Sequence, residues 1–106
     1  MAATAVYARV AAVPTGGKSQ IDEGFSVSNI SATSGAKTLT GGGLYGMTVK
    51  ASTYGTVALQ ILGPDDTTWL AVAVQNGATG GYATTFAADG YGTVYLPPGQ
   101  YRIAIA

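Results

Sequence analysis

The chain has 106 residues, the length of one domain, and it contains neither cysteine nor histidine. Only 9% of the residues are charged, against about 25% in typical soluble domains, and the five cations and five anions cancel. The basic residues are scattered singly, which argues against nucleic-acid binding, and no disulfide can hold the fold. Such a weakly charged surface favours a protein that lives in an assembly, with a small monomer covered in threonine, serine and glycine as the alternative.

Residues 1–24 are predicted to form an N-terminal strand or extended arm, and residues 25–106 a β-sandwich body. Residues 4–13 (TAVYARVAAV) alternate as a strand does, and a proline–glycine segment ends them. A signal peptide is disfavoured because no basic residue precedes the apolar run and Arg9 interrupts it. No segment approaches the roughly 20 apolar residues of a membrane helix. We therefore expect a soluble protein, made in the cytoplasm and without membrane contact.

Residues 25–52 are expected to hold two strands, 25–31 and 44–52, separated by a glycine-rich loop. The loop residues are small and polar and offer little to bury, so at most one short strand, at 37–40, is predicted between them. In the second strand one face is apolar, as a half-buried strand requires. That face consists of Tyr45, Met47 and Val49.

Residues 56–74 (TVALQILGPDDTTWLAVAV) are predicted to form an antiparallel hairpin. The first run alternates with a period of two, and the segment Gly63-Pro64-Asp65-Asp66 is a turn signal. Proline fixes the backbone there, and aspartate bonds to amides two residues on. Trp69 begins the second arm, and its orientation stays open. It either caps the core, as large aromatic side chains usually do, or faces outward as an adhesive contact point.

The last third of the chain is predicted to consist of short strands joined by turns. Asn76-Gly77 is a strong hairpin signal because both residues tolerate positive φ. Further strands are expected at 84–88, 91–96 and 101–105, with a type II turn at Pro97-Pro98-Gly99 before the last one. About eight short strands without helical periodicity indicate an all-β protein, a single-domain antiparallel β-sandwich or jelly roll.

Residues suited to catalysis or to binding a metal ion or cofactor are few. General acid–base chemistry would depend on carboxylates, lysine or tyrosine, and Asp65, Asp66 and Asp89 already occupy turn signals. A calcium site is not predicted, because the sequence contains no loop of alternating acidic residues that ends in a glutamate. A G-x-G-x-x-G match at residues 41–46 leads into a strand rather than a helix. We therefore expect no enzyme activity, no cofactor and no metal.

The tyrosines divide into two groups. Tyr45 and Tyr101 lie on the apolar faces of their predicted strands and are expected in the core. Tyr54, Tyr82 and Tyr91 lie in or near turns, where they could stack on sugars or pack on a protein partner. Scattered surface aromatic residues are also common without a function, so this alternative stays open.

Three segments, GGLYGMTVKAS, TVALQILGPDDTTWLAVAV and TFAADGYGTVYLPPGQYRIAIA, resemble a known family. They are similar to small β-sandwich proteins encoded beside capsid genes in tailed bacteriophages. The shared pattern is a Gly-Leu-Tyr strand, a Leu-Gln-x-x-Gly-Pro-Asp hairpin with a following Trp, and a terminal Leu-Pro-Pro-Gly-x-Tyr-Arg strand. The resemblance covers residues 42–106 and implies a head decoration, or cement, protein that oligomerises on the outer capsid surface.

That resemblance implies a structural virion protein that is made in the cytoplasm of the bacterial host and located on the capsid surface. Its partners would be the major capsid protein and further copies of itself, for which a trimer fits closed symmetry. The candidate contact residues are Val6, Tyr7, Arg9, Val10, Tyr54, Tyr82 and Tyr91. The alternative is a non-catalytic binding module, similar to a fibre or adhesin domain, that recognises glycans or a receptor through Trp69 or the loop tyrosines.

Overall fold

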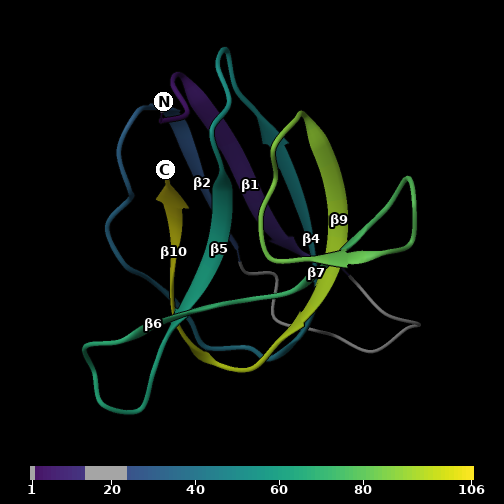
Figure 1. Cartoon of the computed structure of the whole chain (residues 1–106). Helices are drawn as coiled ribbons and strands as arrows, with labels where there is room; N and C mark the ends of the chain where they lie inside the picture. Colours follow the sequence, from purple (N-terminus) through teal and green to yellow (C-terminus); the bar gives the residue numbers. More distant parts are fainter. Residues whose placement is uncertain (1, 14–23) are drawn as a thin grey trace.

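Alternating apolar side chains shape most of the chain into strands. The computed structural model describes residues 2–13 and 24–106, and these ranges form ten strands and no helix. The strands make two antiparallel sheets that pack face to face (Figure 1). The predicted all-β sandwich is confirmed. It has more strands than turn spacing predicted, which was about eight.

The larger sheet has six strands, in the spatial order β2–β1–β4–β9–β7–β8. Their bounds are β1 Val6–Ala12, β2 Gly24–Ile30, β4 Gly43–Lys50, β7 Val74–Asn76, β8 Tyr82–Ala83 and β9 Gly90–Leu96. Successive side chains of a strand point to opposite faces. In β1 this alternation buries Val6 and Val10 and exposes Tyr7 and Arg9.

The smaller sheet has four strands, in the order β3–β10–β5–β6. Their bounds are β3 Lys37–Leu39, β5 Val57–Leu62, β6 Trp69–Ala71 and β10 Gly99–Ile105. The chain moves between the two sheets after β2, β3, β4, β6 and β9. Each sheet is therefore assembled from segments that are distant in sequence, and the outward side chains of those segments share a surface.

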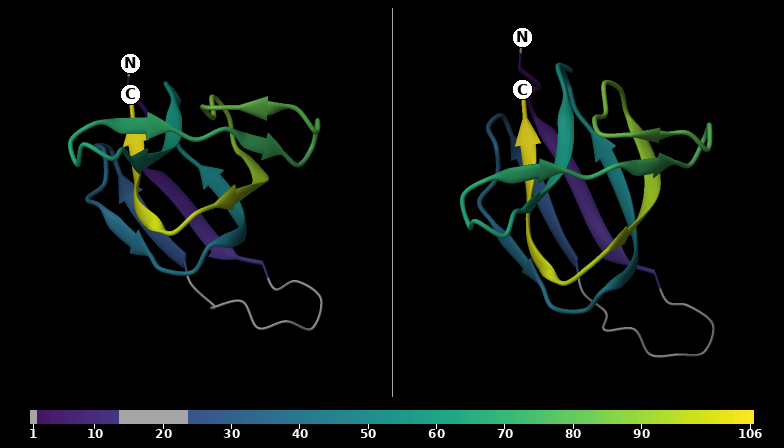
Figure 2. Two further views of the ribbon diagram at one scale, coloured as in Figure 1. Left: turned by 90° about the horizontal axis from the view of Figure 1, so that it is seen from below. Right: turned by 60° about the horizontal axis from the view of Figure 1, so that its bottom comes forward.

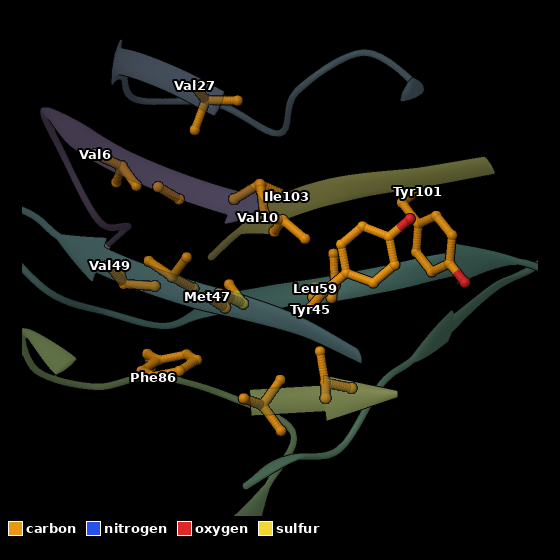
Figure 3. Close-up of a cluster of buried hydrophobic side chains, with 14 of the residues drawn as sticks. Val6, Val10, Val27, Tyr45, Met47, Val49, Leu59, Phe86, Tyr101 and Ile103 are labelled. Atoms are coloured by element: carbon orange, nitrogen blue, oxygen red, sulfur yellow. The ribbon is translucent and has the colours of Figure 1, made fainter. Parts of the chain in front are cut away.

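The inward faces of the two sheets form one core. Figure 3 shows valines, Met47, Leu59 and Ile103 converging between the sheets, with the rings of Tyr45 and Tyr101 side by side at one end. The largest fully buried side chains are Tyr45, Tyr101, Leu39, Met47, Leu59, Ile103, Val6, Val10 and Val57. The prediction that Tyr45 and Tyr101 belong to the core is confirmed.

Each of these two buried tyrosines is bonded to the backbone four residues upstream. The Tyr45 hydroxyl donates to the Gly41 carbonyl, and the Tyr101 hydroxyl donates to the Pro97 carbonyl. Both bonds lie where the chain changes sheets, from β3 to β4 and from β9 to β10. We call these arrangements the tyrosine corners, because a tyrosine that bonds back across an inter-sheet connection is typical of β-sandwiches.

Residues 6–12 of the predicted N-terminal strand or arm form a strand within the body. β1 lies between β2 and β4 and is paired with both. Deleting residues 1–13 would therefore remove an inner strand of the sheet, and the division at residue 24 does not separate β1 from the sandwich. The part of the proposed arm at residues 14–23 lies outside the described residues.

The predicted hairpin at 56–74 is confirmed in its first part only. β5 and β6 are antiparallel and pair Leu62 with Trp69, but the chain then leaves the small sheet and continues as β7 of the large one (Figure 2). The reason is burial, because Val74 is 2% exposed and packs in the core from the other sheet. Local alternation cannot reveal such a change of sheet.

Two other connections differ from the prediction. Pro97-Pro98 turns the chain from β9 to β10 in the opposite sheet, and Gly99 lacks the positive φ of a type II turn. Around Phe86 the predicted strand is reduced to an isolated bridge with Val57. The Asn76 hairpin is present between β7 and β8 with a loop of more than two residues. The Asn76 side chain accepts bonds from the amides of the next turn.

Candidate binding surface

The outward face of the six-stranded sheet gathers large exposed aromatic side chains. Tyr95 is 78% exposed, Tyr82 71%, Tyr91 55% and Tyr7 47%. They come from β1, β8 and β9, and those of β1 and β9 alternate with inward residues such as Val94 and Leu96. We call this surface the tyrosine face and define it as Tyr7, Arg9, Thr48, Lys50, Tyr82, Tyr91, Thr93 and Tyr95.

Strand register brings the members of the tyrosine face together in rows. Arg9 lies opposite Thr48, and Thr48 lies opposite Tyr91. In a neighbouring row, Gln75 pairs with both Thr93 and Tyr82. Directly opposed residues of antiparallel strands have Cβ atoms about 5 Å apart. Side chains from five strands therefore form a continuous surface.

Two shallow hollows mark this surface. One, of about 310 Å³, lies over β2, β1 and β4. Its outward lining includes Tyr7, Arg9, Ser26, Ser28, Thr48 and Lys50. The other, of about 250 Å³, lies over β9, β7 and β8, with a lining that includes Leu44, Gln75, Tyr82, Thr93 and Tyr95. The first is polar and cationic and the second is aromatic, so the face has two halves of different chemistry.

The charge of the cationic half is only partly compensated. Lys50 acts on Asp89, whose pKa is lowered chiefly by the hydrogen bond from the Tyr54 hydroxyl. That bond is 2.6 Å long, and the Ala51 amide donates to the same carboxylate over 3.1 Å. No hydrogen bond or ion pair to a described residue neutralises Arg9. A partner for this half would therefore carry negative charge or hydrogen-bond acceptors.

Four of the seven predicted contact residues meet on the tyrosine face, namely Tyr7, Arg9, Tyr82 and Tyr91. Val6 and Val10 were wrong choices, because both are 0% exposed and pack in the core. Tyr54 is partly buried, and its hydroxyl is bonded to Asp89. Burial and the neighbouring Asp89 raise the pKa of Tyr54. Its hydroxyl is used within the chain, because it holds the turn at Asp89.

Tyr95 belongs to the tyrosine face but was missed in the sequence. Its signal was present, since it lies four residues after Tyr91, between the inward Val94 and Leu96. Alternation places such a residue on the same face as Tyr91.

The carboxylates of the turns have local structural roles. Asp65 accepts bonds from the Thr68 hydroxyl (2.6 Å) and from the Thr68 and Thr67 amides (2.9 and 3.1 Å). These bonds hold the pKa of Asp65 well below its usual range. Within residues 2–13 and 24–106, no group of three histidine, cysteine or acidic side chains is close enough to hold a metal ion.

Trp69 lies on the outer side of the four-stranded sheet. It is half-buried, is not part of the core cluster, and packs under the guanidinium of Arg102 at 4.4 Å from its ring centroid. Of the two orientations left open by the sequence, the outward one is therefore observed. The expectation that tryptophan caps the core fails here because the Arg102 side chain covers the ring in place of the opposite sheet.

Comparison with protein-family models, with curated proteins and with solved structures gave no match. None of the described segments is a helix of the length and apolarity that crossing a membrane requires. The features that bear on function are therefore the outward faces of the six-stranded and the four-stranded sheet.

Proposed function

We propose that this protein is a head decoration, or cement, protein of a tailed bacteriophage. In this role it binds the outer surface of the capsid as a homo-oligomer and stabilises the shell across capsomer junctions. Its partners are the major capsid protein and its own copies, with a trimer as the expected closed form. The observation that supports the proposal best is the tyrosine face, a broad exposed surface with four large aromatic side chains.

The physical character of the tyrosine face suits a protein contact. Tyrosine supplies large contact area at a low cost in side-chain entropy and is enriched where protein surfaces meet. The face is built on paired strands, so its residues are held in place before binding, which lowers the entropic cost of association. A broad surface of this kind fits a shell of repeated subunits.

The sheet edges are less suited to contact than this face. β2 is the longest edge strand, and its pairing with β1 shifts register between Val6 and Ala8 near Asn29, which has a positive φ of 53°. The edge strands β3 and β6 have three residues each, and β8 has two. Bulges and short strands discourage the addition of a further strand. We therefore propose that capsid contact is made by the face and not by a sheet edge.

Binding in this way stabilises a capsid by mass action. A ligand that binds the assembled shell but not its separated subunits lowers the free energy of the assembled state. The effect grows with the number of occupied sites and needs no chemical step. A rigid sandwich with structural turn carboxylates is sufficient for such a function.

Replacing Tyr7 and Tyr95 together with serine is expected to weaken capsid binding by at least about tenfold, because exposed aromatic anchors contribute most of the binding energy at protein contacts. The measurement is co-sedimentation of the purified protein with shells of the major capsid protein encoded in the same genome. Unfolding curves would show that the variant is folded, since both tyrosines lie outside the core.

The matched control is Leu70→Ser, which removes a large side chain that is 48% exposed on the other sheet. It should leave capsid binding unchanged. Failure of the unaltered protein to bind these shells at saturating, stoichiometric occupancy would contradict the proposed function. If Leu70→Ser and the tyrosine variant lost capsid binding equally, the tyrosine face would not be the capsid contact.

The second candidate is a glycan-binding module, and the aromatic hollow favours it specifically. Tyr82 and Tyr95 border this hollow together with Gln75 and Thr93, and aromatic rings beside amide and hydroxyl groups suit a sugar ring. Binding on a glycan array that Tyr82→Ser abolishes, without any binding to shells, would favour this module over the cement protein.

A further inference from the structure

Three long side chains form a cluster on the outer face of the four-stranded sheet, opposite to the tyrosine face. Arg102 of β10 lies directly across from Gln60 of β5, which in turn lies across from Ala71 of β6, two residues from Trp69. The Arg102 Nε donates to the Gln60 Oε1 over 2.8 Å. Its guanidinium carbon is 4.4 Å from the centroid of the Trp69 ring.

These contacts fix the orientation of the guanidinium. Stacking on the indole restrains its plane, and the bond to Gln60 restrains its rotation within that plane. An arginine normally loses much side-chain freedom when it binds a ligand, and here most of that loss has occurred on folding. The cluster is therefore preorganised as a cationic hydrogen-bond donor.

The remaining donors of Arg102 are not used within the described chain. Gln60 is the only described residue that accepts a hydrogen bond from this side chain, and no described carboxylate forms an ion pair with it. The edge between Nη1 and Nη2 carries two parallel N–H donors, which match the two oxygens of a carboxylate. A carboxylate bound there would be held by two charge-assisted bonds beside an apolar indole.

The described part of the chain offers few carboxylates for such a site. Asp65 is bonded to Thr67 and Thr68, and Asp89 is bonded to Tyr54 and Ala51. Asp66 is the remaining acidic residue of the described ranges. The charge of the site and this shortage among the described residues both favour a carboxylate supplied by another polypeptide.

We propose that the Gln60–Trp69–Arg102 cluster is a carboxylate-binding contact that receives an aspartate or glutamate side chain of a different protein. Arginine and tryptophan are the residues that most often dominate protein contacts, above all where they are packed together. The site does not depend on the proposed function. It gives the four-stranded sheet a contact of its own, chemically distinct from the tyrosine face.

The test is a titration of the ¹⁵N-labelled protein with a glutamate decapeptide, with a glutamine decapeptide at the same ionic strength as reference. The NMR signals to follow are the Arg102 Nε–H and the Trp69 indole N–H. Emission from Trp69, the sole tryptophan, provides a second readout. We expect saturable shifts of both signals with the glutamate peptide and none with the glutamine peptide.

Two variants and one control define the result. Arg102→Lys keeps the positive charge but loses the planar pair of donors. Gln60→Ala keeps Arg102 but removes the hydrogen bond that restrains its guanidinium. Each variant should weaken binding of the glutamate peptide by about tenfold. Lys37→Arg, a charge-conserving change at an exposed residue of β3 that belongs to neither contact, should bind as the unaltered protein does.

Absence of a saturable shift would overturn the inference. So would equal binding by Arg102→Lys, or equal weakening by Lys37→Arg. Sedimentation that reveals a self-association abolished by Arg102→Lys would identify the occupant as a second copy and would overturn the choice of a different protein. None of these results depends on shells, so this inference and the cement function can fail separately.

Discussion

Replacing Gly92 with alanine is expected to destabilise the protein by about 3 kcal/mol, at the upper end of the cost of overpacking. A Cβ at this position would lie 2.4 Å from the Gln75 carbonyl oxygen and 2.7 Å from a methyl carbon of Val74. The first of these atoms belongs to the backbone of β7, so β7 must move away from β9. The measurement is the free energy of unfolding in urea at neutral pH.

The matched control is Gly35→Ala. No atom lies within 4 Å of a Cβ built at Gly35, so stability should change by no more than about 0.5 kcal/mol. Equal stability of the Gly92 and Gly35 variants would mean that β7 is not held against β9 as closely as described. Loss of the β7 pairing would also disturb the aromatic half of the tyrosine face, because Gln75 and Tyr82 depend on it.

The elements that could be predicted from sequence are those whose pattern is local. Alternation located β1, β4, β5 and β10, and the Pro64-Asp65 turn located the hairpin between β5 and β6. The distribution of these strands between two sheets could not be predicted, because it depends on which distant strand each one meets. Residues 69–74 pass from one sheet to the other at residues 72–73, yet their sequence has the same local pattern as a single strand.

The candidate surface was predictable to a similar extent. Tyr82 and Tyr91 were chosen as loop tyrosines, yet they contact solvent from strands of one sheet. Val6 and Val10 were excluded by the same alternation that exposes Tyr7, and applying it to β1 would have corrected the choice. The approach of Arg102 to Trp69 joins residues from different strands, and only the sheet register reveals it.

Replacing Tyr101 with phenylalanine is expected to destabilise the fold by about 1 kcal/mol, because the Pro97 carbonyl loses its hydrogen-bond donor at a partly buried connection. Tyr45→Phe should have a similar effect at the Gly41 carbonyl. The two rings lie side by side (Figure 3), so the double variant should depart from the sum of the single effects. Urea unfolding at neutral pH measures all three values.

The tyrosine corner at Tyr101 also predicts a loss of stability at high pH. Burial, with a smaller contribution from Tyr45, raises the pKa of Tyr101 to about 12. An unfolded tyrosine ionises at a pH of about 10. Between these values the unfolded chain releases a proton that the folded chain retains, so the contribution is complete below pH about 10 and decreases towards pH 12.

Tyr101→Phe should therefore flatten the decline of stability with pH across this alkaline range. Tyr95→Phe is the control, because that side chain is 78% exposed and should leave both the neutral stability and the alkaline slope unchanged. An alkaline slope that persists in Tyr101→Phe and disappears in Tyr95→Phe would show that a surface phenol governs the transition. A slope that persists in Tyr95→Phe and decreases in Tyr101→Phe would assign the ionisation to Tyr101. The stability of the sandwich would then depend on the connection between β9 and β10.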